Sequence, residues 1–110
     1  MPFYGEWERT LDARWRVALP TKIQKGIGHK VFLAATDENG GLRILPGTFK
    51  PPKGEERMFH EVDLRKRSGS LLILIGGDVR RQFRFSIKPH SKVLLVGCGD
   101  HLELYPAGSR

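Results

Sequence analysis

Apolar and polar residues alternate along several short segments of the chain, a period of two that is typical of β-strands with one buried face. The alternation in segments 5–11 and 16–20 predicts two strands joined by a turn at 12–15. Two further strands are predicted at 30–36 and 41–46, because the Asp, Asn and Gly residues between them suit a hairpin tip. The first half of the chain therefore predicts four short β-segments.

Two other segments have a helical pattern. Segment 20–28 predicts one short helix, with Pro20 or Thr21 near its start and a glycine at its end. Segment 55–67 has an imperfect apolar helical face, and its charged residues are expected to form a solvated opposite side. The longest apolar run, 71–75, predicts a buried strand. The apolar face of segment 55–67 consists of Met58, Phe59, Val62 and Leu64.

The second half of the chain repeats the pattern of the first. Setting the halves against each other places Phe83 opposite Trp15 and Arg84 opposite Arg16. Two copies within one chain imply a pseudo-twofold unit. The matched pairs of segments are 11–19 with 79–87, 30–34 with 92–96, and 42–46 with 102–106.

The chain has 110 residues, which is enough for one hydrophobic core, so we expect a single pseudo-twofold domain over 1–110. Within it we place a first repeat at 1–48, a linker and helix at 49–70, and a shortened second repeat at 71–110. The predicted fold class is mainly β with one or two short helices, in the α+β class.

The charge of the chain favours an anionic partner. Nineteen Lys and Arg residues against twelve Asp and Glu give a formal charge of +7. Nucleic acid is the first such partner and a membrane surface the second. No apolar run approaches the ~20 residues of a bilayer span, and no basic amphipathic helix is evident, so no membrane association is expected. The N-terminal segment lacks the pattern of a secretory signal and the single cysteine, Cys98, cannot form an internal disulfide, so we expect a cytoplasmic protein.

The sequence does not predict an enzyme. Cys98, Asp100 and His101 invite a nucleophile hypothesis, but the repeat places segment 97–101 at a hairpin tip, and a turn explains it better. The four histidines lack metal-ligand spacing, so we expect no metal site, no cofactor and no small-molecule substrate. These histidines are His29, His60, His90 and His101.

The motifs described above resemble the MraZ family of bacterial regulators of the division and cell wall gene cluster. Segment 5–20, GEWERTLDARWRVALP, matches the family's first repeat, in which Asp12 and Arg16 supply its D-x-x-x-R signature. Segments 71–87 and 92–106 resemble the second repeat. Aromatic residues, Trp15 and Phe83, stand where the family has a turn glycine, and Arg80 stands where it has its second aspartate.

The resemblance implies a swapped-hairpin AbrB-like β-barrel built from the two repeats. It also implies sequence-specific binding of double-stranded DNA near promoters, association with the nucleoid, and assembly of several chains into a ring-like homo-oligomer. A different class of function fits the same fold: a structural oligomerisation module with weak or no specific DNA binding.

Arginines in the two matched turns are the candidate DNA contacts, because a guanidinium group donates paired hydrogen bonds to phosphates and guanine edges. For Arg16, a DNA contact and local pairing with Asp12 are equally good interpretations. Packing or a subunit interface explains Trp15 and Phe83 better than stacking on a base. The candidate DNA-binding residues are Arg14, Arg16, Arg80, Arg81 and Arg84, with Asp12, Lys22, Lys25 and Lys88 in support.

Overall fold

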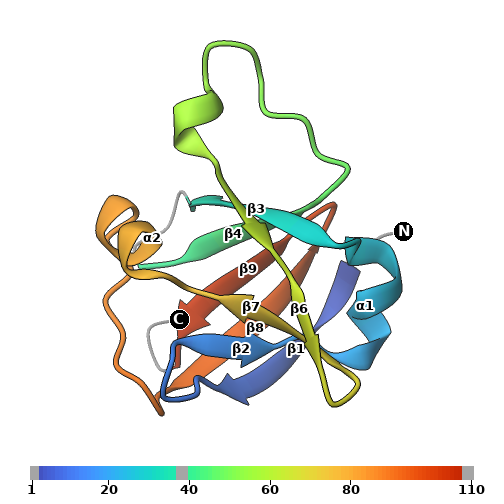
Figure 1. Cartoon of the computed structure of the whole chain (residues 1–110), viewed down its shortest axis with the longest axis vertical. Helices are drawn as coiled ribbons and strands as arrows, with labels where there is room; N and C mark the ends of the chain where they lie inside the picture. The colour runs from blue at the N-terminus through green and yellow to red at the C-terminus, as the bar shows by residue number, and fades with distance from the viewer. Residues whose placement is uncertain (1–2, 37–39, 108–110) are drawn as a thin grey trace.

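Nine strands and three short helical segments form over the residues that the structure, a computed structural model, describes: 3–36 and 40–107 (Figure 1). The mainly β, α+β class predicted from the sequence is confirmed. The elements of the first half are β1 (Phe3–Thr10), β2 (Arg16–Ala18), α1 (Thr21–Ile27), β3 (Lys30–Ala35) and β4 (Leu42–Pro46). They are followed by η1 (Glu56–Met58), β5 (His60–Asp63), β6 (Arg65–Arg67), β7 (Ser70–Leu74), α2 (Gly77–Gln82), β8 (Lys92–Gly99) and β9 (Leu102–Pro106).

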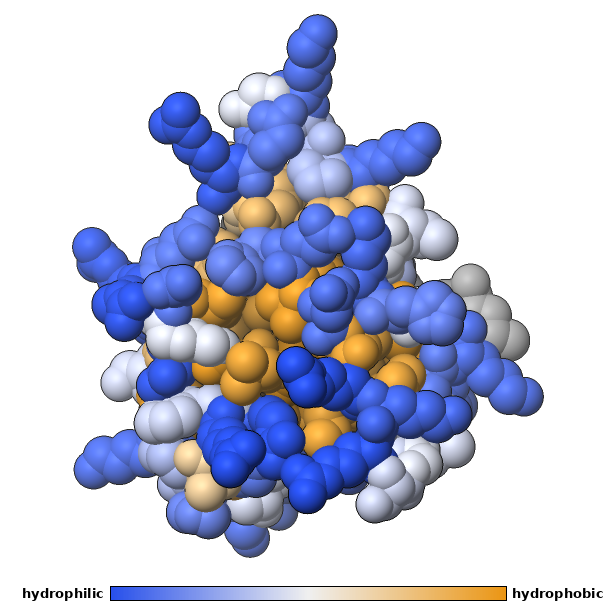
Figure 2. All heavy atoms as spheres, viewed as in Figure 1, coloured by the Kyte–Doolittle hydropathy of each residue, from blue (hydrophilic) through white to orange (hydrophobic). Residues whose placement is uncertain are grey.

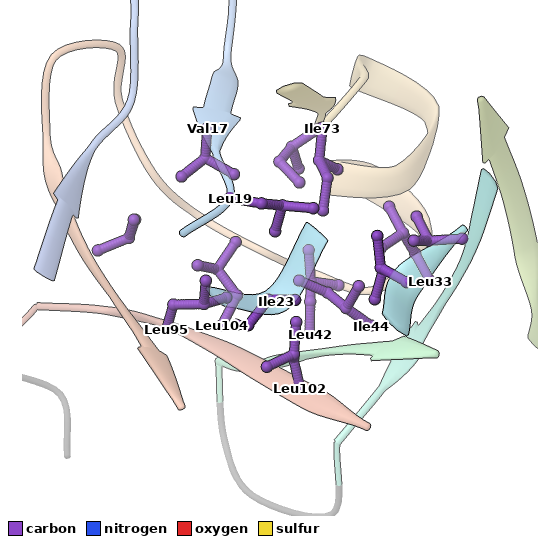
Figure 3. Close-up of a cluster of buried hydrophobic side chains, with 14 of the residues drawn as sticks. Val17, Leu19, Ile23, Leu33, Leu42, Ile44, Ile73, Leu95, Leu102 and Leu104 are labelled. Carbon is purple, nitrogen blue, oxygen red and sulfur yellow. The ribbon is translucent and has the colours of Figure 1, made fainter. Parts of the chain in front are cut away.

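The strands form two antiparallel sheets that enclose one core. The larger sheet has the order β1-β8-β9-β4-β3-β5, and the smaller has the order β2-β7-β6. Apolar side chains from both sheets and from α1 meet between them, among them Val17 and Ile73 from the smaller sheet and Leu33 and Leu104 from the larger (Figure 3). These four side chains are fully buried. Closure into a barrel stays a prediction.

The two long hairpins, 30–46 and 92–106, pair in the matching register that the predicted repeat requires. In the β3–β4 hairpin Val31 pairs with Pro46, and in the β8–β9 hairpin the matched Val93 pairs with Pro106. The hairpins also pair with each other through β4 and β9, where Arg43 lies opposite its own counterpart, Glu103. We infer a pseudo-twofold axis between these two residues. The residues at the first hairpin's predicted tip, 37–39, lie outside the described residues.

The predicted match of 11–19 with 79–87 is wrong. Residues 79–82 belong to α2, and no strand forms at 83–88. The actual counterpart of β2 is β7, since the two pair antiparallel about Val17 and Ile73. The flanking hydrogen bonds share this symmetry: the Leu19 amide donates to the Leu71 carbonyl and the Ile75 amide to the Trp15 carbonyl.

The helices that follow these two strands correspond in the same way. Gln24 of α1 donates from its side chain to the Leu19 carbonyl, and Arg80 of α2, 56 residues later, donates to the Ile75 carbonyl. We infer that the second copy begins at β5 and includes much of the segment expected to be a linker.

The helix predicted within 55–67 is also wrong. Only the single turn η1 is helical there, and β5 and β6 follow it. In β5, Val62 is half-buried between the exposed Glu61 and Asp63, which is the period of a strand. β5 pairs with the edge of β3 and β6 pairs with β7, so the backbone hydrogen bonds of two sheets outweigh a weak helical pattern.

Candidate nucleic-acid interface

The first turn (residues 12–16) is organised by the Asp12 carboxylate. Its Oδ1 accepts hydrogen bonds from the backbone amides of Arg14 and Arg16, at 2.8 and 2.9 Å. Its Oδ2 accepts one from Arg16 Nε at 2.7 Å. A side chain that binds the backbone two and four residues ahead holds a turn in one conformation. It holds Trp15 at a φ of +56°, a region that favours glycine.

The two arginines of this turn have different environments. The Arg16 side chain is 21% exposed and is paired with Asp12. Arg14 is exposed, and within the described part of the chain its guanidinium group forms no ion pair. Arg14 is therefore available to an external anion, whereas Arg16 fixes the turn from which Arg14 projects.

The charge on Asp12 gives the first turn a pH-dependent stability. Although partial burial opposes it, hydrogen bonds from the Arg16 and Arg14 amides and from the Arg16 side chain hold the pKa of Asp12 below its ordinary value. Since the pKa is lower in the folded chain, this contribution is complete above the unfolded value of about 3.9 and is lost as pH falls through the folded value.

We expect Asp12→Asn to reduce the free energy of unfolding by under about 1 kcal/mol at pH 7, because the ion pair is partly exposed. The difference from the wild type should shrink as urea unfolding is repeated from pH 7 down to pH 3. Asp12→Ala, which also removes the acceptor of two backbone amides, should cost more at pH 7. A wild-type to Asp12→Asn difference that does not change with pH would contradict this assignment.

The second group of predicted arginines lies on and after α2 rather than in a matching turn. Arg80 is half-buried: its Nε donates to the Ile75 carbonyl at 3.1 Å, and its guanidinium group lies 3.7 Å from the centre of the Trp15 ring. Arg81 pairs with Asp78 at 2.5 Å, and both side chains are exposed. Arg84 is exposed at a φ of +53°. The fold thus brings α2 against the first turn, and Arg80 connects them.

The two aromatic residues pack against the main core cluster. Trp15 also donates from its indole nitrogen to the Ile87 carbonyl at 3.2 Å, in the segment that follows α2. Phe83 ends α2 and is half-buried. The two residues occupy different structural positions, because one lies in a turn and the other at the end of a helix.

The predicted supporting lysines are all exposed. Lys22 and Lys25 lie on α1, and Lys88 lies in the segment between α2 and β8. α1 lies beside the end of the smaller sheet where β6 turns into β7 (Figure 1).

Sequence reasoning missed a second basic segment (residues 65–70). Its first three residues, Arg65, Lys66 and Arg67 of β6, are all exposed. The turn that follows has positive φ at Ser68 and Gly69, +52° and +82°. The sequence signal for this segment is the run RKR before a small-residue turn, which the helical pattern of 55–67 places on the solvated side of a helix.

The first turn and the second basic segment lead into the opposite ends of one two-stranded ribbon, β2 with β7. The first turn precedes β2 and the second segment precedes β7, so the pseudo-twofold relates them. The ribbon extends from Trp15 to Leu19, and Leu19 lies opposite Leu71. Exposed Arg14 lies just before one end of this ribbon, and exposed Arg67, which pairs with Ser70 at the start of β7, lies at the other end.

A groove of about 700 Å³ lies beside this ribbon, where β5 diverges from β7. Its apolar residues include Val62, Leu72 and Leu74, and Leu74 is 47% exposed. The predicted buried strand at 71–75 is therefore buried on one face only. Figure 2 shows apolar residues at the centre of this face with hydrophilic residues around them. The charged side chains of the groove are Arg14, Arg16, Arg65, Glu61, Asp63 and Asp78.

Among the described residues, no helix has both the length and the apolar character needed to cross a bilayer. No family model matches the chain.

Three proteins named as the transcriptional regulator MraZ are similar to the chain. The one from Acetivibrio thermocellus is 33% identical over an alignment of 89 positions, which covers 64% of this chain and 62% of that protein. The one from Mycoplasmopsis pulmonis is 26% identical over an alignment of 124 positions, which covers 96% of this chain and 79% of that protein. The one from Syntrophomonas wolfei is 27% identical over an alignment of 121 positions, which covers 94% of this chain and 80% of that protein. The aligned part thus spans under two thirds of the Acetivibrio protein but about four fifths of the other two.

Proposed function

The chain is a divergent member of the MraZ family, and on this premise we propose that it is a transcriptional regulator that binds double-stranded DNA. The observation that carries the proposal is the placement of exposed arginines at both ends of the β2–β7 ribbon. Two related basic ends on one face suit a duplex, whose phosphates recur with regular spacing on both sides of a groove.

At the first end of the ribbon, one arginine contacts DNA and two other residues stabilise the turn. Arg14 is exposed and contacts a phosphate or a base edge, while Asp12 and Arg16 hold the turn that presents it. The Arg80 guanidinium group packs on the Trp15 ring, and Arg81 and Arg84 extend the basic surface along α2 and just after it. Phosphate contacts of this kind position the protein, and sequence preference comes from those groups that reach base edges.

The second end of the β2–β7 ribbon has exposed cations but no aspartate that holds its turn, unlike the first end. The Leu11 amide donates to the Ser91 carbonyl just before β8, and the Leu64 amide donates to the His29 carbonyl just before β3. Leu64 is therefore the counterpart of Leu11, so the next residue, Arg65, stands where the first copy has Asp12. The second copy therefore lacks the signature aspartate and places an exposed cation there. Lys22 and Lys25 of α1 extend the basic surface at this end, as α2 does at the other. We infer that this end binds backbone phosphates and contributes little base discrimination.

The chain functions as a homo-oligomer in this proposal, in the ring-like arrangement that the family resemblance implies, and acts at the nucleoid in the cytoplasm. The apolar strip formed by half-buried Leu72 and exposed Leu74 supports self-association, because such surface is costly to leave in water. No catalytic step and no small-molecule substrate enters this proposal.

Fluorescence anisotropy with a duplex from the promoter region of the chain's own gene tests the proposal, with a scrambled duplex of equal composition alongside. Titrations at 50 and 200 mM salt should show affinity falling with a slope of about −0.9 per phosphate contact in a log–log plot. Preference for the promoter duplex supports sequence-specific regulation. No binding at 50 mM salt by a chain of defined oligomeric mass would instead identify a structural oligomerisation module.

A further inference from the structure

The tip of the β8–β9 hairpin brings together three side chains that can bind a metal ion. Cys98 lies near the end of β8, His101 lies in the turn, and Glu103 lies on β9. One potential ligand atom from each, the Cys98 sulfur, a His101 ring nitrogen and a Glu103 carboxylate oxygen, all lie within 4.8 Å of one another. None of these residues lines the groove beside the β2–β7 ribbon.

Neighbouring side chains orient the imidazole and the carboxylate. His101 Nδ1 lies 2.7 Å from Asp100 Oδ1, so that a proton on Nδ1 is held by this carboxylate and Nε2 is directed elsewhere. Nε2 lies 2.9 Å from Glu103 Oε2, while the Tyr105 hydroxyl donates to the other oxygen, Oε1, at 2.5 Å. Metal ligands in proteins are oriented in this way: a carboxylate is hydrogen-bonded to the ligating histidine, and a donor is hydrogen-bonded to the ligating carboxylate.

The imidazole and the carboxylate are shielded from solvent, whereas Cys98 is exposed. The His101 and Glu103 side chains are 13% and 22% exposed. Arg43 of the neighbouring strand is the facing cation, so two carboxylates and a thiol face one fixed positive charge.

The distances suit a small tetrahedral ion after a modest adjustment. With bonds of about 2.0 Å to nitrogen or oxygen and 2.3 Å to sulfur, ligand atoms around one zinc ion lie about 3.3–3.6 Å apart. The observed 2.9 Å between Nε2 and Oε2 would open slightly, and separations of up to 4.8 Å would close by about 1 Å. Rotation of exposed or half-buried side chains can supply such movements. A thiolate, an imidazole and a carboxylate together favour zinc-class ions over Mg²⁺ or Ca²⁺.

We propose that the tip of the β8–β9 hairpin is a binding site for a divalent transition metal ion of the zinc class, with Cys98 Sγ, His101 Nε2 and Glu103 Oε2 as its ligands. Solvent supplies the fourth ligand of a tetrahedral ion. On binding, the metal replaces the proton of the thiol and any proton on Nε2. The site belongs to the second copy alone, because the first hairpin has Thr36 and Arg43 at the positions of Cys98 and Glu103. The spacing of the histidines in the sequence predicts no metal site, because it does not show that the turn at 97–101 brings His101 beside Cys98 and Glu103.

Titration of the reduced full chain with Co²⁺, followed by displacement with Zn²⁺, tests the site. We expect one Co²⁺ per chain, a thiolate-to-cobalt charge-transfer band, and d–d absorption of tetrahedral strength. Cys98→Ser should abolish the charge-transfer band, and His101→Gln and Glu103→Gln should each weaken binding at least tenfold, because even the loss of a group that only supports a ligand costs about 10–100-fold. Glu103→Gln keeps an acceptor for the Tyr105 hydroxyl, so the hairpin itself should remain folded.

His29→Gln removes an exposed histidine elsewhere on the chain and is the matched control; it should bind Co²⁺ like the wild type. Zinc should also raise the thermal midpoint of the wild type in proportion to the logarithm of its concentration, but not that of Cys98→Ser. Absence of a thiolate band in the folded wild type would overturn the proposal. Equal affinity in His29→Gln and His101→Gln, or one metal ion shared by two chains, would overturn it as well.

Discussion

Replacing both Arg65 and Arg67 by alanine is expected to weaken binding to duplex DNA about 60-fold at 0.1 M salt. Both residues are exposed on β6, and alternation along the strand places them on the same face. If each contacts one phosphate, the double substitution removes two contacts and reduces the salt slope by about 1.8. Each phosphate contact contributes about 0.9 log unit of binding constant at 0.1 M salt relative to 1 M salt. Loss of two such contacts gives the expected loss of affinity. Anisotropy titrations at three or more salt concentrations measure both quantities.

The matched control is Lys50→Ala with Lys53→Ala. These lysines are exposed and lie in the connection between β4 and β5, which projects from the end of the molecule opposite to the turn between β6 and β7 (Figure 1). The control removes the same formal charge, so a general effect of net charge would lower affinity equally in both variants. We expect the control to change affinity less than about threefold. An equal loss in the two variants would show that binding does not depend on the β2–β7 ribbon.

The same titration with a scrambled duplex separates positioning from sequence preference. Because the second basic segment is proposed to contact phosphates, the Arg65 and Arg67 substitutions should weaken promoter and scrambled duplexes alike. Arg14→Ala should instead reduce the preference for the promoter duplex if Arg14 reaches a base edge, where one good contact discriminates by ~1–3 kcal/mol.

Ile73→Ala is expected to reduce the free energy of unfolding by about 2–5 kcal/mol, the range for truncating a large aliphatic side chain in a core. Ile73 is fully buried at the centre of β7, where it pairs with Val17 across the pseudo-twofold. Its truncation leaves a cavity between the two sheets. Because small domains are stable by only ~5–15 kcal/mol, this loss is a large fraction of the total. Urea unfolding should show a lower midpoint with an unchanged m-value.

Leu74→Ala is the control for this prediction, since it truncates the adjacent residue of the same strand on its exposed face. Leu74 is 47% exposed, so its substitution should cost under about 1 kcal/mol. Similar costs for the two variants would contradict the assignment of Ile73 to a shared core. Leu74→Ala also tests self-association, because a smaller apolar strip should lower the oligomeric mass if this strip is an interface.

The long hairpins and α1 could be predicted because their signals are local. The turn residues at 36–41, the alternation on either side, and the glycine that follows α1 act within a few residues of one another. The D-x-x-x-R turn could also be predicted from the sequence, because Asp12 is hydrogen-bonded to a residue only four positions away, Arg16. Arg14 and Arg16 were therefore found from the sequence in the turn that the structure contains.

The second half of the proposed interface could not be predicted in the same way. The match of RRQFR with DARWR compares a helix end with a turn, and composition alone does not distinguish the two. The place of Arg65 and Arg67 in the proposed interface depends on the pairing of β6 with β7. This pairing matches β5 and β6 with the beginning of the first repeat.

The sequence by itself determined the mainly β class, both long hairpins, the first helix, and an excess of positive charge suited to DNA. Only the tertiary structure decided that residues 60–67 form strands, that Arg80 stacks on Trp15 from 65 residues away, and that Cys98, His101 and Glu103 converge. The physical reason is the range of the interactions. Turn chemistry and side-chain alternation act between near neighbours, whereas strand pairing between β3 and β5 or β2 and β7 joins residues that are distant in the chain and outweighs local preference.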